Sequence, residues 1–261
     1  MKFGVCAPFE RMEWIHELGF DYMEARLKDV AGMCDEELEQ IQKRLAGLGM
    51  RAETFNLFCP SELRLSCNVD EDSLRAYAKV AFSKAERLGG EIAVVGSGKA
   101  RAILEGFSLE AAKDSFARAL ELIADVAKEH HMKIVIEPLN RKETDLVNTL
   151  ADAAEMCARI GRPDIGALVD LYHFYRNGED ITDIQTYGEY ILHTHIARRN
   201  DDRGAPCLEN GAEGAKEFLA ALERIGYRGR ISLESSSKFD FAESTTKYAT
   251  LLRHLGYLKQ A

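Results

Sequence analysis

Residues 133–139 read KIVIEPL, and this stretch contains the pattern that decides the fold. An unbroken apolar run, Ile134-Val135-Ile136, ends at the carboxylate of Glu137, and a proline follows. Residues 165–170 (IGALVD) repeat the pattern and end at Asp170. Near-continuous apolar runs are typical of parallel strands that are covered on both faces. The two segments therefore predict strands of a buried parallel sheet.

Similar segments along the chain give eight predicted strands: residues 3–7, 21–25, 51–57, 91–96, 133–139, 165–170, 191–197 and 230–235. Longer segments with apolar residues at helical spacing lie between them, and Ser108 and Thr149 stand at expected N-caps. Alternating strands and helices imply a parallel sheet. Because eight such units nearly fill residues 1–261, we expect one domain of class α/β, a (β/α)8 TIM barrel. An open doubly wound sheet is the alternative.

Composition narrows the function classes. Of the 261 residues, 46% are hydrophobic and 30% are charged, which is typical of a soluble globular protein. The net charge of −9 disfavours binding to phosphate backbones and to anionic membranes, so neither nucleic acid nor a membrane is an expected partner. No apolar stretch approaches the length of a signal peptide or a membrane span, and we expect a cytoplasmic protein. The six cysteines form no C-x-x-C pair and are expected to be free thiols.

Four consecutive predicted strands end in residues that bind metals. These are Glu137, Asp170, His195 and Glu234. In TIM barrels the active site lies at the carboxyl ends of the strands. Three buried carboxylates at one barrel mouth would be costly, and a divalent cation would offset that cost. Any one of these residues by itself is compatible with a surface position, but the repeated pattern predicts a metal site.

Three oxygen ligands and one imidazole suit Mn²⁺, Mg²⁺ or Co²⁺. His193 points to the same side of its strand as His195 but lies one layer deeper, so we interpret it as a hydrogen-bonded core histidine. Gly96-Ser97-Gly98-Lys99 follows a strand without the further glycines of a nucleotide-binding loop. We interpret it as an active-site loop.

The strings IEPLNRKETD, LVDLYHF, HTHIA and SLESS resemble the xylose isomerase-like barrel family. Within it they resemble ketose 3-epimerases and hydroxypyruvate isomerases. The resemblance implies an isomerase of carbohydrate metabolism with one divalent metal ion, Mn²⁺ first, and Mg²⁺ or Co²⁺ as alternatives. It assigns the metal to Glu137, Asp170, His195 and Glu234. It also implies a small-molecule sugar substrate and a homo-oligomer, either a dimer or a tetramer.

The resemblance further implies substrate contacts at Glu143 and His173. It implies an arginine six residues past the imidazole ligand, but Asp201 stands there. Arg203, followed by Gly204-Ala205-Pro206, is the nearest candidate. Trp14 is expected either as an aromatic lid over the pocket or as a packing residue of the first helix.

The chemistry implied by the family is C3 epimerisation of a ketose through a metal-stabilised enediolate, with Glu137 and Glu234 as the acid–base pair. Proton return to a neighbouring carbon would instead give aldose–ketose isomerisation of the hydroxypyruvate type. A sugar-acid or inosose dehydratase would begin with the same proton abstraction. Hydrolysis of the endonuclease IV type needs further histidines after the third and fourth strands, and none stands there. A catalytically silent sugar-binding protein would not need the intact glutamate pair.

Overall fold

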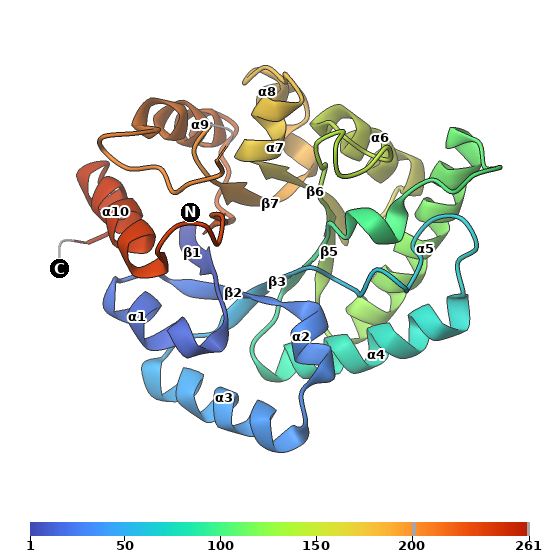
Figure 1. The fold of residues 1–261 in the computed structure, drawn as a ribbon, viewed down its shortest axis with the longest axis horizontal. Coiled ribbons are helices and arrows are strands. Elements are labelled where there is room, and N and C mark those ends of the chain that lie inside the picture. The colour runs from blue at the N-terminus through green and yellow to red at the C-terminus, as the bar shows by residue number, and fades with distance from the viewer. Residues whose placement is uncertain (200–201, 260–261) are drawn as a thin grey trace.

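Eight parallel strands close into a barrel in which each strand pairs with its sequence neighbours and β1 pairs with β8 (Figure 1). This is a computed structural model that describes residues 1–199 and 202–259. The strands are β1 (Lys2–Cys6), β2 (Tyr22–Arg26), β3 (Ala52–Asn56), β4 (Ile92–Val95), β5 (Lys133–Ile136), β6 (Ile165–Asp170), β7 (Ile191–Ile196) and β8 (Arg230–Leu233). The predicted TIM barrel is confirmed, and the β1–β8 pairing rules out an open sheet.

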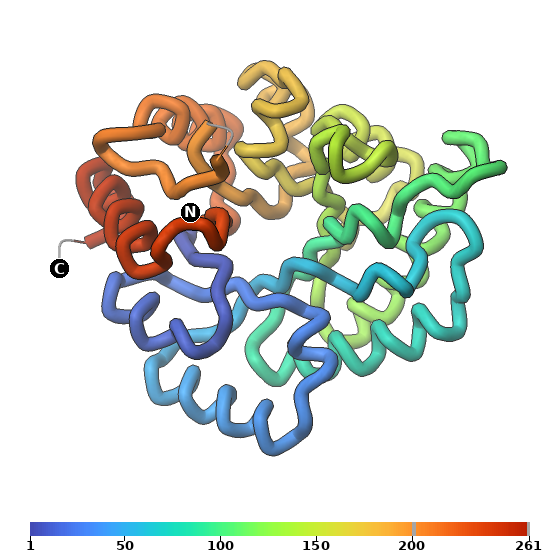
Figure 2. The backbone as a smooth tube through the Cα atoms, viewed as in Figure 1, coloured from blue at the N-terminus to red at the C-terminus, as the bar shows by residue number. Residues whose placement is uncertain are grey.

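Helices surround the barrel, and the chain runs around it in sequence order (Figure 2). They are α1 (Met12–Glu17), α2 (Leu27–Gly32), α3 (Asp35–Leu48), α4 (Glu71–Arg87), α5 (Leu109–Glu129), α6 (Leu150–Ile160), α7 (Leu171–Arg176), α8 (Asp183–Thr186), α9 (Ala212–Arg224) and α10 (Phe241–His254). The short 3-10 helices are η1 (Phe9–Arg11), η2 (Gly98–Arg101) and η3 (Gly188–Tyr190). Ser108 and Thr149 cap α5 and α6 as predicted, each accepting a hydrogen bond from a backbone N–H.

Several strand and helix bounds differ from the sequence prediction. The strand predicted over residues 133–139 ends at Ile136, because Pro138 has no N–H to continue the ladder. The short helices α7 and α8 between β6 and β7 were not predicted, since four to six residues carry too little periodicity to identify a helix.

The barrel interior is divided into an apolar and a polar half. A separate apolar cluster on β4, β5 and β6 comprises Ile92, Val94, Val135 and Leu168. Fully buried polar side chains on the other strands include Glu24, Thr54, His193 and Ser232. Because side chains alternate along each strand, the residues that follow these on the same face reach the carboxyl end of the barrel.

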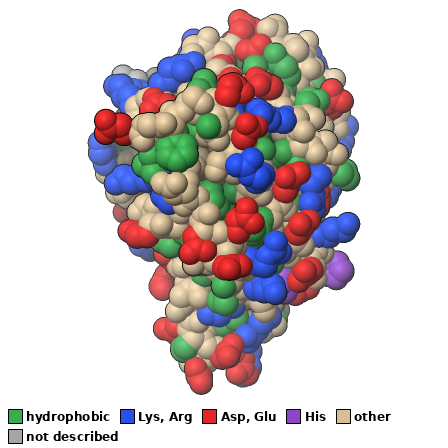
Figure 3. Space-filling view, turned by 90° about the vertical axis from the view of Figure 1, so that its right-hand side faces the viewer, with side chains coloured by type: hydrophobic (Ala, Val, Ile, Leu, Met, Phe, Trp, Pro, Cys, Tyr) green, Lys and Arg blue, Asp and Glu red, His purple; other side chains and the backbone are tan. Residues whose placement is uncertain are grey.

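Positive and negative side chains are interspersed on the face shown in Figure 3. That face therefore offers no continuous basic area for a polyanion. Among the described residues, no helix is both long and apolar enough to cross a membrane.

The amino end of the barrel is held by an ion-pair network around the buried side chain of Glu53. Its carboxylate accepts hydrogen bonds from Lys2 at 2.8 Å, from Arg51 at 3.0 Å and from Arg230 at 2.5 Å. Burial alone would raise the pKa of Glu53, but Lys2 and Arg230 hold that pKa below its ordinary value. A carboxylate with a lowered pKa stabilises the fold above its unfolded-state pKa, and this stabilisation is lost as the pH falls.

We therefore predict that Glu53→Gln lowers the free energy of unfolding at pH 7 by about 1–3 kcal/mol. The difference from wild type should shrink as the pH falls from the unfolded-state pKa of about 4 toward the lower folded-state pKa, where the wild-type carboxyl also becomes neutral. Urea unfolding at pH 7 and at about pH 3 measures both effects. Glu39→Gln, which breaks only an exposed ion pair with Lys43, is the control and should change little. Equal losses for Glu53→Gln at the two pH values would contradict the prediction.

Candidate metal centre

The four predicted metal ligands converge at the carboxyl end of the barrel. One ligand atom from each of Glu137, Asp170, His195 and Glu234 lies within 4.8 Å of the others. His195 Nδ1 lies 3.0 Å from Glu234 Oε2, 3.5 Å from Glu137 Oε1 and 3.9 Å from Asp170 Oδ2. Four consecutive strands, β5 to β8, supply these residues, and only the Glu234 side chain is partly exposed, at 22%.

The geometry of His195 fits a cation placed between its Nδ1 atom and the three carboxylates. Its Nδ1 is buried and has no hydrogen-bond partner, yet it faces three carboxylates. An unpartnered imidazole nitrogen beside carboxylate oxygens is the donor set of a divalent metal site. Glu137, Asp170, His195 and Glu234 are therefore the residues that would hold such an ion.

Glu24 lies beneath the centre and hydrogen-bonds the other side of the imidazole ligand. Its Oε1 accepts from His195 Nε2 at 2.9 Å, and its Oε2 lies 2.8 Å from His193 Nε2. Burial alone would raise the pKa of Glu24, but the two imidazoles hold that pKa well below its ordinary value. His193 is fully buried and takes no place among the four ligands, in agreement with its interpretation as a core histidine.

Cys6, Glu24 and His195 form a second group of possible ligands that shares the same imidazole. Glu24 already accepts four hydrogen bonds, so both of its oxygens have partners within the protein. Burial and the neighbouring Glu24 also raise the pKa of the Cys6 thiol well above its ordinary value. A neutral thiol is a poor ligand, so this group does not match the first as a metal site.

The position of Glu137 depends on two residues of the segment after β4. A Cβ atom on Gly96 would lie 1.8 Å from Glu137 Oε2, so any larger residue here would push this carboxylate out of its present position. Arg101, which is fully buried at the end of η2, donates from Nη2 to the Glu137 backbone carbonyl at 2.6 Å. The segment that begins at Gly96 thus supports the metal centre and gives the predicted active-site loop a structural basis.

Arg203 reaches into the centre from the loop between β7 and α9. Its Nη2 donates to Asp170 Oδ2 at 2.5 Å and also to Glu234 Oε2. Its guanidinium carbon lies 5.1 Å from the centre of the Tyr172 ring. Burial would raise the pKa values of Asp170 and Glu234, but Arg203 and the neighbouring His195 hold both below their ordinary values. The alternative position for this arginine, Asp201, lies outside the described residues.

His173 lies beside Asp170, and Glu143 lies beside His173; the resemblance implied substrate contacts at His173 and Glu143. His173 Nδ1 accepts hydrogen bonds from the Asn140 backbone at 3.2 Å and from its side-chain amide at 3.0 Å. The ring proton therefore sits on Nε2, which lies 3.9 Å from Asp170 Oδ2. The same Asn140 amide donates to Glu143 Oε1 at 2.6 Å, so Asn140 links both residues.

Trp14 and Asn56 lie on other sides of the barrel mouth. Trp14 Nε1 donates to Thr245 Oγ1 of α10 at 2.9 Å, and the residue is 37% exposed. This contact fits the packing interpretation of Trp14 as well as a position at the rim. Asn56, at the end of β3, donates to Glu234 Oε1 at 3.3 Å, while its own carbonyl oxygen is buried without a partner.

Sequence reasoning did not identify Glu24, Gly96 or Asn140 as parts of the site. Glu24 had a detectable signal, because a carboxylate within the strand YMEAR needs a partner just as Glu137 does. Gly96 was noted only as part of a loop. The role of Asn140 depends on its contact with His173 of α7, 33 positions away, and local sequence does not encode such a contact.

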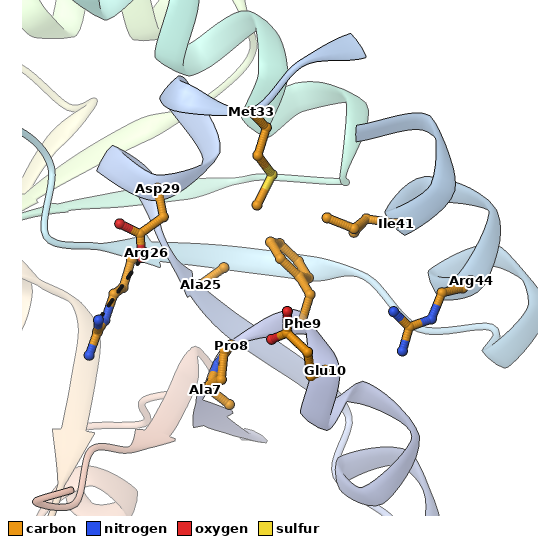
Figure 4. Close-up of a pocket in the computed structure, with 10 residues that line it drawn as sticks. All are labelled: Ala7, Pro8, Phe9, Glu10, Ala25, Arg26, Asp29, Met33, Ile41 and Arg44. Carbon is orange, nitrogen blue, oxygen red and sulfur yellow. Dashed lines mark ion pairs between the residues drawn. The ribbon is translucent and has the colours of Figure 1, made fainter. Parts of the chain in front are cut away.

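A separate pocket of about 310 Å³ lies beside η1, α2 and α3 (Figure 4). Phe9, Met33 and Ile41 form an apolar surface there, and the ion pair Arg26–Asp29 lies at its edge. Ala25 also lines it, and since Ala25 follows Glu24 in β2 it faces the opposite side of that strand. The pocket is therefore outside the barrel and distinct from the metal centre.

Together, the fold and the site define a TIM-barrel protein with a centre of three carboxylates and one imidazole. The family model of the xylose isomerase-like TIM barrel matches residues 12–257, and the chain belongs to that family.

Among individual proteins, this chain is similar to several sugar epimerases. A ketose 3-epimerase of Arthrobacter globiformis is 30% identical over 138 residues, which are 52% of this chain and 46% of that protein. This chain thus spans about half the length of that relative. An L-ribulose 3-epimerase of Mesorhizobium japonicum is 28% identical over 92% of this chain and 79% of its own length. The crystal structure of D-psicose 3-epimerase with D-tagatose from Clostridium cellulolyticum H10 has the same fold, with a TM-score of 0.85, 18% identity and full coverage of both chains.

We predict that Gly96→Ala weakens Mn²⁺ binding at least tenfold, because the new methyl group would displace the Glu137 carboxylate. Isothermal titration calorimetry of the metal-free protein with Mn²⁺ measures this. Gly47→Ala, at a helical position with no atom within 4 Å of the new Cβ, is the matched control and should bind as wild type. Unchanged affinity in folded Gly96→Ala would show that Glu137 does not need this space.

Proposed function

We propose that the protein is a divalent-metal-dependent isomerase that epimerises a ketose at C3. The observation that carries the proposal is the convergence of the Glu137 and Glu234 carboxylates on His195 Nδ1 from β5 and β8. These strands flank β6 and β7, so the two glutamates approach the centre from different sides. A base and an acid on two sides of one carbon are what inversion at that carbon requires.

The names of the similar proteins support the substrate class. The relatives compared above are a ketose 3-epimerase and an L-ribulose 3-epimerase, and this chain spans most of the second. The full convergence of the four ligand side chains adds support from the chain itself. We therefore favour a ketose over other carbonyl compounds.

A divalent cation bound by the four ligands would polarise the sugar carbonyl and offset negative charge that develops on its oxygen. Each glutamate directs one oxygen toward His195 and the other elsewhere: Glu137 Oε2 lies over Gly96, and Glu234 Oε1 accepts from Asn56. We propose that one glutamate removes the proton from C3 and that the other returns a proton to the opposite face.

Hydrogen-bonding groups beside the centre would orient the sugar. His173 presents its Nε2–H toward Asp170, held by the hydrogen bonds that its Nδ1 accepts from Asn140. We propose that this N–H and the Arg203 guanidinium bind sugar oxygens, and that Glu143 accepts from a sugar hydroxyl. A contact of Trp14 with the sugar, an oligomer that is a dimer or a tetramer, and a cytoplasmic location stay predictions.

We predict that Glu137→Gln and Glu234→Gln each abolish turnover, since an amide cannot accept or return the proton. The assay is incubation of ketoses in D₂O followed by NMR, which detects both deuterium at C3 and the product formed. Glu189→Gln, at an exposed position, is the control and should retain activity.

The same spectra distinguish the related reactions. An epimer with deuterium at C3 supports the proposal. An aldose product would indicate aldose–ketose isomerisation, and loss of water would indicate a dehydratase. Most of the activity remaining in either glutamine variant would contradict the acid–base assignment.

Metal removal gives an independent test. We predict that dialysis against EDTA eliminates turnover and lowers the Tm, because a ligand that binds only the folded state stabilises it. Adding Mn²⁺ should restore both, with Mg²⁺ and Co²⁺ as comparisons. Full turnover in protein shown to be metal-free by elemental analysis would overturn the metal dependence.

A further inference from the structure

We infer that Glu24 is a positioning residue that fixes the proton of His195 on Nε2 and thereby keeps Nδ1 available as a metal ligand. This inference rests on the proposed metal centre, and it concerns a residue outside the four ligands. Glu24 lies on β2, which is not one of the four strands β5 to β8 associated with those ligands, and it is fully buried.

The two oxygens of Glu24 have different partners. Oε2 accepts three hydrogen bonds: from Thr54 Oγ1 at 2.7 Å, from Ser232 Oγ at 2.6 Å and from His193 Nε2 at 2.8 Å. Oε1 has His195 Nε2 as its hydrogen-bond donor, at 2.9 Å. Three donors therefore fix the carboxylate in place and direct its remaining oxygen at the imidazole ligand.

A further hydrogen bond supports this arrangement from β2. Ser232 donates to Glu24, so the hydroxyl of Tyr22, 2.8 Å away, donates to Ser232 in turn. Tyr22 fits inside the barrel because Gly4 faces it, and a Cβ at that position would lie 2.5 Å from the ring. Residues of β1, β2, β3, β7 and β8 thus cooperate to orient one carboxylate oxygen.

The consequence for the metal centre follows from the tautomers of histidine. A neutral imidazole has one N–H and one lone pair, and a carboxylate that accepts from Nε2 leaves the lone pair on Nδ1. Nδ1 is the atom that faces Glu137, Asp170 and Glu234 and has no hydrogen-bond partner. Hydrogen bonds of this kind behind a metal-binding histidine commonly raise metal affinity about 10- to 100-fold.

The substitution Glu24→Gln gives a sharp test, because the two ends of an amide differ. The carbonyl oxygen of the substituted side chain would face the three donors that now bind Oε2, which turns its NH₂ group toward His195 Nε2. His195 would then accept through Nε2 and carry its proton on Nδ1, where a metal ligand is needed. Glu24→Gln should therefore weaken Mn²⁺ binding about 10- to 100-fold.

The matched control is Thr54→Val. It is nearly isosteric and removes one hydrogen bond to Oε2 in the same buried network without touching either imidazole. We expect its Mn²⁺ affinity to stay within about threefold of wild type, although its Tm should fall because a buried hydrogen bond is lost.

The experiment is a titration of each metal-free protein with Mn²⁺, in which electron paramagnetic resonance measures the concentration of the free ion. NMR of ¹⁵N-histidine-labelled protein at a pH where His195 is neutral reports which ring nitrogen carries the proton. We expect a protonated Nε2 in wild type and in Thr54→Val, and a protonated Nδ1 in Glu24→Gln. Thermal unfolding of all three proteins verifies that they are folded, and Glu24→Asp, which keeps the charge but shortens the reach, replaces Glu24→Gln if the latter does not fold.

Wild-type affinity in folded Glu24→Gln would overturn the inference, as would an equal loss in Thr54→Val. An unchanged His195 tautomer in Glu24→Gln would overturn it as well. Failure of the wild-type protein to bind Mn²⁺ has a separate meaning, because it would contradict the proposed metal centre itself.

Discussion

The three carboxylates at the barrel mouth impose the constraint on which the rest of this structure depends. Glu137, Asp170 and Glu234 approach one imidazole nitrogen within 3.9 Å in a largely buried site, where like charges repel strongly. The cationic group of Arg203 offsets part of that repulsion through its contacts with Asp170 and Glu234. The arrangement remains rich in oxygen ligands, which is the electrostatic condition that favours a bound divalent cation.

The surrounding protein holds Glu137, His195 and Glu234 by different means. Gly96 provides space for one oxygen of Glu137, while Arg101 anchors the backbone of that residue. Glu24 orients His195 from below, and Asn56 contacts the outer oxygen of Glu234. Neighbouring groups of this kind restrict the side chains before any substrate arrives, and such preorganisation is a major source of precision at catalytic sites.

The barrel interior shows how a fold can be stable at one end and chemically active at the other. At the amino end, Glu53 is surrounded by Lys2, Arg51 and Arg230, so its charge is matched. In the middle, hydrogen bonds around Glu24 satisfy a buried charge with two imidazoles and two hydroxyls. At the carboxyl end three carboxylates face the guanidinium of Arg203 and the imidazole of His195, so negative groups outnumber positive ones. The imbalance is confined to the end where TIM barrels bind their substrates.

The sequence by itself determined the barrel, the strand order and which four side chains meet at the barrel mouth. It could do so because apolar strand runs and helix caps are local signals, and because strand ends in a parallel barrel must meet at one rim. Glu137, Asp170, His195 and Glu234 were therefore identifiable from position alone. Only the tertiary structure decided which imidazole nitrogen faces the carboxylates, what the absence of a side chain at residue 96 makes room for, and that Glu24 and Asn140 lie at the site. These features depend on contacts between residues far apart in the chain, such as Glu24 and His195, which are 171 positions apart, and no local pattern encodes such a contact.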